Sequence, residues 1–239
     1  MNHETILILD FGGQYNQLIA RRVRDLNVFC EVLPYSTPVE QIRAAGYRGI
    51  IFTGGPNSVN AVNAPKCDPD VFRLGLPILG ICYGAQLMAE QLGGRVEAAE
   101  KREYGHIDLT VNTSATIFTG VPANTTCWMS HTDHIVKMPE NFTITATTAT
   151  CAIAGMVDPE RRFHAVQFHP EVQHTPEGNR MLRNFLYSVC SCVGDWQMST
   201  FVSDSVEAIR SQIGDRRVLC ALSGGVDSSV AALLVHKAV

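Results

Sequence analysis

A cysteine with a glycine two residues away on each side is the first feature whose residue types suit chemistry. In LGICYGAQ, residues 79–86, an apolar run ends at Cys82, between Gly80 and Gly84. This spacing matches the nucleophile elbow G-x-S-x-G, with sulfur in place of oxygen. The glycines permit a sharp turn from strand to helix, which leaves the sulfur at a helix N-terminus, where unpaired N–H groups favour a thiolate. The spacing predicts a nucleophile rather than a buried structural thiol.

A histidine and an acid follow a second apolar run. In AVQFHPE, residues 165–171, His169 stands at the end of a predicted strand and Glu171 comes two residues later. A nucleophilic thiol needs a base within reach, and a carboxylate on the other ring nitrogen orients that base. We therefore expect His169 and Glu171 to form a catalytic set with Cys82.

A glycine pair follows a third apolar run. GIIFTGGP, residues 49–56, ends in Gly54 and Gly55 before a proline. Backbone N–H groups at this point, together with the N–H of Tyr83, would hold the oxyanion of an acyl-transfer intermediate. A plain tight turn would use the same residues. The pair gains weight because the carboxyl ends of parallel strands meet at one edge of a sheet, where such folds hold ligands.

The order of elements predicts the scaffold. Short apolar runs alternate with helical spacing over the first ninety residues, which indicates βαβ units and a mostly parallel sheet with helices on both faces. The expected strands are 5–10, 28–33, 49–56 and 77–81, and the expected helices are 17–26 and 82–92. From residue 95 to 168, Thr- and Val-rich runs predict an added antiparallel ribbon with strands at 106–111, 141–148, 151–157 and 163–168, and a closing helix follows at 178–189.

A second pattern begins after a boundary near residues 190–198. We expect one α/β domain over 1–195 and the first part of another over 199–239. In the latter, helical spacing covers 202–214, and 217–239 predicts a strand, a glycine turn and a helix. A parallel strand without partners leaves its ladder unpaired, so we expect residues after about 198 to be loosely packed.

The turn in that second pattern, LSGGVDSS at 222–229, is a candidate phosphate loop. Its glycines let the backbone approach phosphate oxygens, and N–H groups at the following helix N-terminus bind them. Asp227 is suited to hold Mg²⁺, and the Walker A pattern is absent. The residues predicted to bind ATP or its pyrophosphate are Ser223, Gly224, Gly225, Val226, Asp227, Ser228 and Ser229.

Composition sets the outer limits. The net charge of −4 offers no basic field for nucleic acid, and the N-terminal apolar run is too short for a signal peptide or a membrane span. Eight scattered cysteines without a CxxC pair favour reduced thiols over a disulfide framework. We expect a cytoplasmic protein with no nucleic-acid or membrane partner and no tightly bound cofactor.

Taken together, GICYGAQ, TGGP and FHPE resemble the class I glutamine amidotransferases over roughly residues 5–190. The resemblance implies a flavodoxin-like fold, glutamine as the substrate, and hydrolysis of its side-chain amide through a glutamyl thioester. It implies that Cys82 is the nucleophile, His169 the acid and base, and Glu171 the orienting carboxylate. The oxyanion and substrate positions would be Gly54, Gly55, Tyr83 and Gln86.

The string SGGVDSS resembles the pyrophosphate loop of the ATP pyrophosphatases. An amidotransferase followed by this loop resembles a family of glutamine-dependent ligases that adenylate xanthosine monophosphate (XMP) with MgATP and then aminate it; residues 6–26 and 128–136 fit that resemblance. It implies that Ser130, His131 and Asp133 couple the two activities. It also implies a homodimer formed through a C-terminal domain outside these 239 residues, so this chain alone would be competent only for glutamine hydrolysis.

Several alternatives stay open at this point. The same Cys-His-Glu set would serve a thiol peptidase, SGGxDS loops occur in other adenylating enzymes, and a non-catalytic nucleotide-binding module would need only the loop. Residues 128–136 would also suit a plain hairpin loop, or a metal site by the spacing of His131 and His134. The chain has Gly12-Gly13 where the family commonly has DFGSQY, and we expect a local turn change that leaves the chemistry unaffected.

Overall fold

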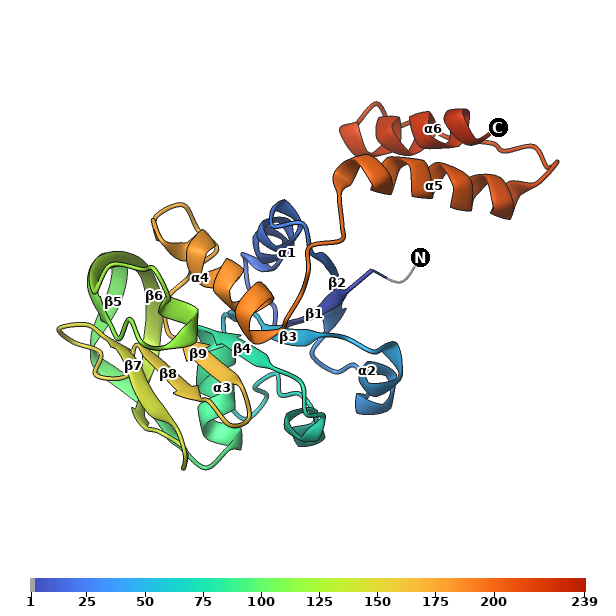
Figure 1. Cartoon of the computed structure of the whole chain (residues 1–239). Coiled ribbons are helices and arrows are strands. Elements are labelled where there is room, and N and C mark those ends of the chain that lie inside the picture. The colour runs from blue at the N-terminus through green and yellow to red at the C-terminus, as the bar shows by residue number, and fades with distance from the viewer. Residues whose placement is uncertain (1–2) are drawn as a thin grey trace. The chain divides into compact units, whose positions relative to one another are not determined.

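A computed structural model describes residues 3–239, with the backbone alone for 100–102 and 198–200. The chain divides into two compact units, Met1–Asp195 and Trp196–Val239 (Figure 1). The strands of the first unit are β1 Thr5–Asp10, β2 Phe29–Pro34, β3 Gly49–Phe52, β4 Ile78–Ile81, β5 Arg95–Val111, β6 Asn124–Lys137, β7 Thr143–Thr147, β8 Gly155–Asp158 and β9 Phe163–Val166. Its helices are α1 Asn16–Asp25, α2 Val39–Ala45, α3 Tyr83–Gln91 and α4 Gly178–Asn184, which a π-helical turn extends over Phe185–Val189, with short 3-10 turns at Pro69–Arg73 and Thr116–Phe118.

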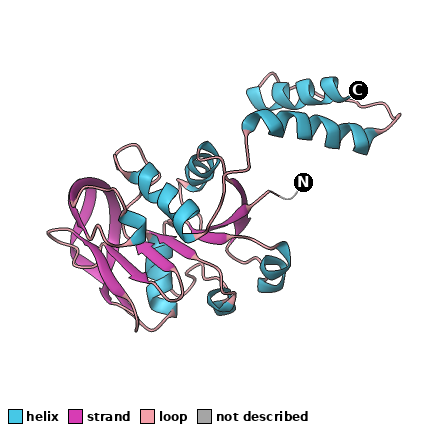
Figure 2. Ribbon diagram, viewed as in Figure 1, coloured by secondary structure: helices cyan, strands magenta, loops and turns pink. Residues whose placement is uncertain are grey.

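One sheet runs through the whole first unit in the order β2-β1-β3-β4-β9-β8-β7-β5-β6 (Figure 2). The strands from β2 to β9 pair parallel, and those from β9 to β6 pair antiparallel. The predicted α/β core with an added antiparallel ribbon is therefore confirmed. The ribbon is a continuation of the same sheet, and β9 is the strand at which the two halves join.

The core lies on both faces of the parallel half, which is why its strands are continuous apolar runs. Ile6 and Ile8 of β1 belong to the apolar cluster that includes α1 and α4, whereas Leu7 and Leu9 belong to the one that includes α2 and α3. Alternate side chains of a strand point to opposite faces, so a single strand serves both clusters. Layers of this kind hold the strand ends rigidly in place.

Two segments differ from the expectations for the first unit. The helix α2 is absent from the predicted elements, because its seven residues are too few to display a clear helical period. The segment 128–136 lies within the long strand β6 and is not a hairpin loop. Alternation of buried and exposed positions along β6 is the signal for this strand, and the polar residues Ser130, His131 and Asp133 obscure it.

The turn between β4 and α3 brings backbones into close contact. A Cβ atom on Gly80 would lie 2.7 Å from the carbonyl oxygen of Gly84, and one on Gly84 would lie 2.5 Å from the Cβ of Phe52. Real Cβ atoms do not approach other atoms so closely. The two glycines that flank Cys82 are therefore required by packing, as the nucleophile-elbow spacing predicts.

The second unit consists of two helices, α5 Met198–Ile213 and α6 Val226–Ala238. The guanidinium of Arg210 on α5 donates hydrogen bonds to the carbonyl oxygens of Ala238 and Lys237, both at 3.0 Å. Both helices were expected, but the strand predicted at the start of 217–239 is wrong: no described residue there is in a strand. A strand forms only against a partner, and none of the described strands pairs with this segment. Within the described residues, no helix has the length and apolar character needed to cross a membrane.

Replacing Gly84 with alanine tests the packing at the turn. The new methyl group would overlap the Cβ and carbonyl oxygen of Phe52, so α3 must move away from β3. Overpacking of this kind costs about 1–3 kcal/mol. Urea denaturation followed by tryptophan fluorescence should show Gly84→Ala unfolding at lower urea than the unchanged chain, and an equal midpoint would contradict the packing described here.

The second unit is expected to exchange its amide hydrogens rapidly. Leu219 is 98% exposed, Val226 78% and Leu222 60%, so little apolar surface is buried to oppose local opening. Hydrogen exchange followed by mass spectrometry should show weak protection over residues 217–238 and strong protection in β1 and β3. Strong protection throughout 217–238 would show this prediction wrong.

Candidate active site

Cys82 sits in a strained backbone conformation at the end of β4. Its φ of 51° and ψ of −105° lie outside the regions that residues with a Cβ normally occupy. Three hydrogen bonds hold it there: its N–H donates to Val166 O at 2.8 Å, and its carbonyl oxygen accepts from the N–H groups of Ala85 and Gln86, both at 3.1 Å. This conformation places Cys82 at the N-cap of α3.

Cys82 and the imidazole of His169 both lie next to Gly54. A Cβ atom on Gly54 would be 3.2 Å from Cε1 of His169 and 3.8 Å from Cβ of Cys82. The strands β3, β4 and β9 run parallel, so the segments that follow them meet at one edge of the sheet. The predicted convergence of these three segments is therefore seen in the structure.

His169 is held from two sides. Its ring Nδ1 lies 2.8 Å from Oε1 of Glu171, whose side chain is fully buried. The backbone N–H of His169 donates to Trp128 O at 3.0 Å. Burial lowers the pKa of His169, but hydrogen bonds to Cys82 and Glu171 and their negative charges raise it well above its ordinary value. The imidazole is thus suited to carry a proton at neutral pH, with the second ring nitrogen directed toward the thiol.

A cavity of about 290 Å³ opens beside these groups. The predicted site residues that line it are Gly54, Gly55, Cys82, Tyr83, Gln86, Ser130, His131, Asp133 and His169. Glu171 lies behind His169 and does not line the cavity. The cavity is also lined by residues that were not predicted as site residues, of which the sequence analysis noted Gly12 and Gly13 only as a departure from the family pattern. These are Gly12, Gly13, Gln14, Tyr15, Pro56, Asn57, Tyr104 and Thr132.

The start of α3 and the Gly54-Gly55 segment line the cavity and are the candidates for holding an oxyanion. Tyr83 is the first residue of α3, so its N–H has no acceptor within the helix. A Cβ atom on Gly55 would lie 2.9 Å from Phe11 O, and one on Gly13 would lie 2.4 Å from Gly54 O. Gly12 and Gly13, where the chain departs from the family pattern, therefore lie in the wall of the cavity. A side chain at position 13 would displace Gly54.

Two glutamines form a link behind the thiol. Gln86 Nε2 donates to Asp133 O at 2.7 Å and to Gln167 Oε1 at 3.1 Å, and Gln167 Nε2 donates to the sulfur of Cys82 at 3.7 Å. The sequence analysis missed Gln167. Its two-residue spacing from His169 was the available signal, because residues two apart in an extended segment point the same way.

The segment with Ser130, His131 and Asp133 forms the opposite wall. The thiol of Cys82 donates to Ser130 O at 3.7 Å, while the His131 side chain is buried against Glu103. Because His131 and His134 are three residues apart on a strand, they point to opposite faces, and a metal site shared by these two is wrong. A coupling role for this segment stays a prediction.

The predicted phosphate loop is a single turn at the start of α6. Gly224 has a φ of 84°, and the hydroxyls of Ser228 and Ser229 both donate to Gly225 O at 2.9 Å. Asp227 lies in the first turn of the helix and is exposed. The turn brings the seven predicted residues together, and their nucleotide role stays a prediction.

Comparisons with known proteins agree with this geometry. The family described as "Glutamine amidotransferase class-I" matches residues 7–189. The "GMP synthase [glutamine-hydrolyzing]" of Ruminiclostridium cellulolyticum is 59% identical, and that of Acetivibrio thermocellus 58%, each over 239 residues. The matches cover 100% of this chain but 47% of those proteins, so the chain spans about half the length of the curated relatives it matches.

Solved structures show the same fold. The crystal structure of a GMP synthase subunit from Thermoplasma acidophilum superposes with a TM-score of 0.72 at 34% identity, over 80% of this chain and 96% of that one. A glutamine amidotransferase from Thermotoga maritima superposes with a TM-score of 0.65 at 18% identity, over 80% of this chain and 99% of that one, and shows likeness of fold.

The pair of His169 and Glu171 predicts a specific pH effect. In Glu171→Gln the carboxylate charge that helps to raise the pKa of His169 is gone, while its burial, which lowers that pKa, remains. The imidazole should therefore lose its proton at a lower pH, as measured by the NMR shift of its ring C–H groups. Glu177→Gln, which removes the charge of an acid paired with Arg180, serves as the control and should not move this titration. If the titration midpoint of His169 is unchanged in Glu171→Gln, Glu171 does not help to raise the pKa of His169, which would contradict this account.

Proposed function

Because this chain belongs to the class-I glutamine amidotransferase family, we propose that its first unit hydrolyses glutamine with Cys82 as nucleophile. One observation carries the proposal: Cys82, with its strained backbone, and the buried His169–Glu171 pair line or back the same cavity, next to Gly54. The cavity is open to solvent on the other side and large enough for an amino acid side chain. We propose that glutamine enters it with the side-chain amide toward the sulfur.

The first half of the reaction transfers the glutamyl group to sulfur. The thiolate of Cys82 attacks the amide carbon, and the N–H groups of Tyr83 and of the Gly54-Gly55 loop hold the resulting oxyanion. His169 then donates its proton to the amide nitrogen. The C–N bond breaks, ammonia leaves, and a glutamyl thioester on Cys82 remains.

The second half restores the enzyme. His169, now neutral, takes a proton from water as the water oxygen attacks the thioester carbon. The C–S bond breaks, glutamate leaves, and the thiolate of Cys82 again faces a protonated His169. The raised pKa of His169 supports this resting pair, because an imidazole of ordinary pKa would lose its proton at neutral pH. Glu171 stabilises the imidazolium and fixes the ring.

We further propose that the ammonia serves a GMP synthase, in which XMP is adenylated with MgATP and then aminated. The support is the 58–59% identity to such enzymes along all 239 residues, together with the loop at the start of α6. The glycine turn and the N–H groups of the first turn of α6 form a donor set that fits a pyrophosphate. The hydroxyls of Ser228 and Ser229, which donate to Gly225 O, would join this set by rotating toward the phosphate. Asp227 would hold Mg²⁺, which neutralises phosphate charge when bound.

Glutamate release from free glutamine tests the proposed hydrolysis. The 239-residue chain should form glutamate, and Cys82→Ala should abolish the reaction. The one hydroxyl side chain at the turn, that of Tyr83, is a phenol that donates to Pro65 O at 2.6 Å, so it cannot replace the sulfur. Cys220→Ser is the matched control, because Cys220 is the exposed cysteine of the chain and lies outside the cavity. Full turnover by Cys82→Ala would refute the mechanism.

Two further measurements separate the competing functions. A chloroketone analogue of glutamine should label Cys82, and glutamine should protect against it, which a nucleotide-binding module without catalysis would not show. A peptide substrate should not be cleaved. Peptide cleavage without glutamate release would instead indicate a thiol peptidase.

A further inference from the structure

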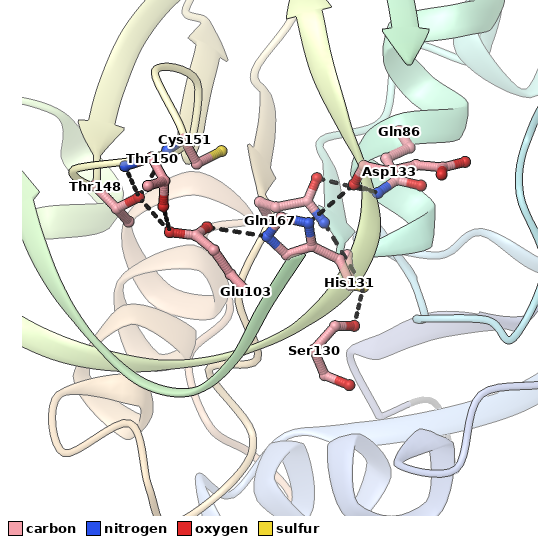
Figure 3. Close-up of polar contacts among 10 residues, drawn as sticks. Gln86, Glu103, Ser130, His131, Asp133, Thr148, Thr150, Cys151 and Gln167 are labelled. Atoms are coloured by element: carbon pink, nitrogen blue, oxygen red, sulfur yellow. Dashed lines mark hydrogen bonds and ion pairs between the residues drawn. The ribbon is translucent and has the colours of Figure 1, made fainter. Parts of the chain in front are cut away.

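A continuous line of polar contacts connects the sulfur of Cys82 to a buried acid in the antiparallel ribbon, and Figure 3 shows its part from Gln167 to Glu103. It passes from Cys82 to Gln167, then to Gln86, the carbonyl oxygen of Asp133, the ring of His131 and finally Glu103. All six residues are buried. The proposed mechanism uses only the cysteine end, so the rest of this line needs an explanation.

The acid end is fully hydrogen bonded. Oε1 of Glu103 accepts from the hydroxyls of Thr148 and Thr150, and Oε2 lies 3.1 Å from Nε2 of His131. Such a set of partners holds a buried carboxyl group in one orientation. Glu103 therefore acts as a fixed point for the ring of His131.

The ring of His131 has an acceptor on each side. Nδ1 lies 3.0 Å from the carbonyl oxygen of Asp133, which can only accept, so Nδ1 carries a hydrogen and donates. Nε2 faces the carboxyl group of Glu103, so one further proton must lie between these two atoms. The pair thus holds a shared proton and fixes the Nδ1–H toward Asp133.

A metal ion is the competing explanation for this end. Ligand atoms of Glu103, His131 and Cys151 lie within 4.8 Å of one another. Both oxygens of Glu103, however, already have partners, and burial together with the charge of Glu103 raises the pKa of the Cys151 thiol to about 12. A neutral thiol and a saturated carboxyl group favour the hydrogen-bonded pair, so we treat a metal as an outcome to be tested.

The carbonyl of Asp133 sets the direction of both amides. It accepts from His131 and also from Gln86, so Gln86 must present its NH₂ group there. That same NH₂ donates to Oε1 of Gln167. The remaining NH₂ group of Gln167 must therefore face the sulfur of Cys82, 3.7 Å away.

We propose that Gln167 is a further catalytic residue, which donates a hydrogen bond to the thiolate of Cys82, and that Glu103 and His131 are positioning residues for it. His131, held by Glu103, keeps the carbonyl of Asp133 in position. That carbonyl and the amide of Gln86 in turn prevent the Gln167 amide from turning its oxygen toward the sulfur. An oxygen in that place would repel the thiolate. The inference rests on the proposed function, since it assigns these residues to the same nucleophile.

Other titratable groups lie near both ends of this line of contacts, so the measurement must report on the thiolate of Cys82 itself. His169 and Glu171 face Cys82. Cys127 and Cys151 lie near Glu103, and His134, on the other face of β6, acts on His131 through its charge. Gln167 is absent from the lining of the cavity, so its loss should not change glutamine binding. The reactivity of Cys82 toward iodoacetamide reports on the thiolate without any need for turnover.

The first experiment compares Gln167→Met with Gln91→Met, both made with Cys220→Ser so that no exposed thiol competes. Gln91 is the matched control, because its amide also contacts a cysteine, Cys67, but at the C-terminal end of α3 and outside the cavity lining. Gln167→Met should slow alkylation of Cys82 at pH 7 about tenfold or more and raise the pH midpoint of alkylation, as loss of a hydrogen bond to a charged group would. Gln91→Met should leave both unchanged.

The second experiment tests the positioning residues. In Glu103→Gln the new amide can donate to Nε2 of His131 and still accept from the threonines, so Nδ1–H stays on Asp133 and alkylation should match the parent. Glu103→Met lacks these bonds and should slow alkylation as Gln167→Met does. In steady-state glutamine hydrolysis, Gln167→Met and Glu103→Met should lower kcat and leave KM unchanged.

The outcomes separate this inference from the proposed function. Glutamine turnover with unaltered alkylation and kcat in folded Gln167→Met would overturn the inference and leave the glutaminase standing. Near-UV circular dichroism checks that each variant is folded. If Glu103→Met does not fold, the milder variant Gln167→Met still tests whether Gln167 acts on the thiolate. Stabilisation of the parent by Zn²⁺ that Cys151→Ser abolishes would overturn the hydrogen-bonded pair in favour of a metal site. Slower alkylation without any glutaminase would support the inference about the thiol and refute the function.

Discussion

The structure depends on one constraint: a cysteine must hold a left-handed φ at the point where a buried strand becomes a helix. That conformation costs on the order of 1–3 kcal/mol, and it persists because neighbouring contacts determine it. The N–H of Cys82 is bound to β9, its carbonyl oxygen is bound to α3, and Gly84 lies directly on Phe52 of β3. Three adjacent strands of the parallel sheet thus share in holding a single residue.

The two halves of the sheet contribute different things to the site. The parallel half provides the thiol, the Gly54 loop and the helix N-terminus, as parallel α/β sheets generally do at their carboxyl ends. The antiparallel half provides the wall with Ser130 and Asp133, and it surrounds the buried pair of Glu103 and His131. His169 follows the strand that belongs to both halves, so it is placed by parallel and antiparallel pairing at once.

Much of this was accessible from the sequence because its signals are local. The apolar runs predicted β1, β3 and β4, the glycine spacing predicted the turn at Cys82, and the fold class is confirmed. The environment of His131 was not accessible, because Glu103 is 28 residues away and meets it only through the register of β5 and β6. The role of Gln167 was not predicted for the same reason, since its partner Gln86 is 81 residues away. The strand expected after residue 217 failed because strands depend on partners that local pattern does not reveal.

The place of β9 in the sheet has a consequence for biosynthesis. The strand pairs with β4, which precedes it by more than eighty residues, and the whole antiparallel ribbon is inserted between them. On the ribosome, β4 therefore waits with one edge open until the ribbon has been translated and β9 has emerged. The nascent chain contains the sulfur long before it contains the imidazole, so the two reactive groups meet only once nearly the entire first unit has been synthesised. Such long-range pairing is a late and slow folding event.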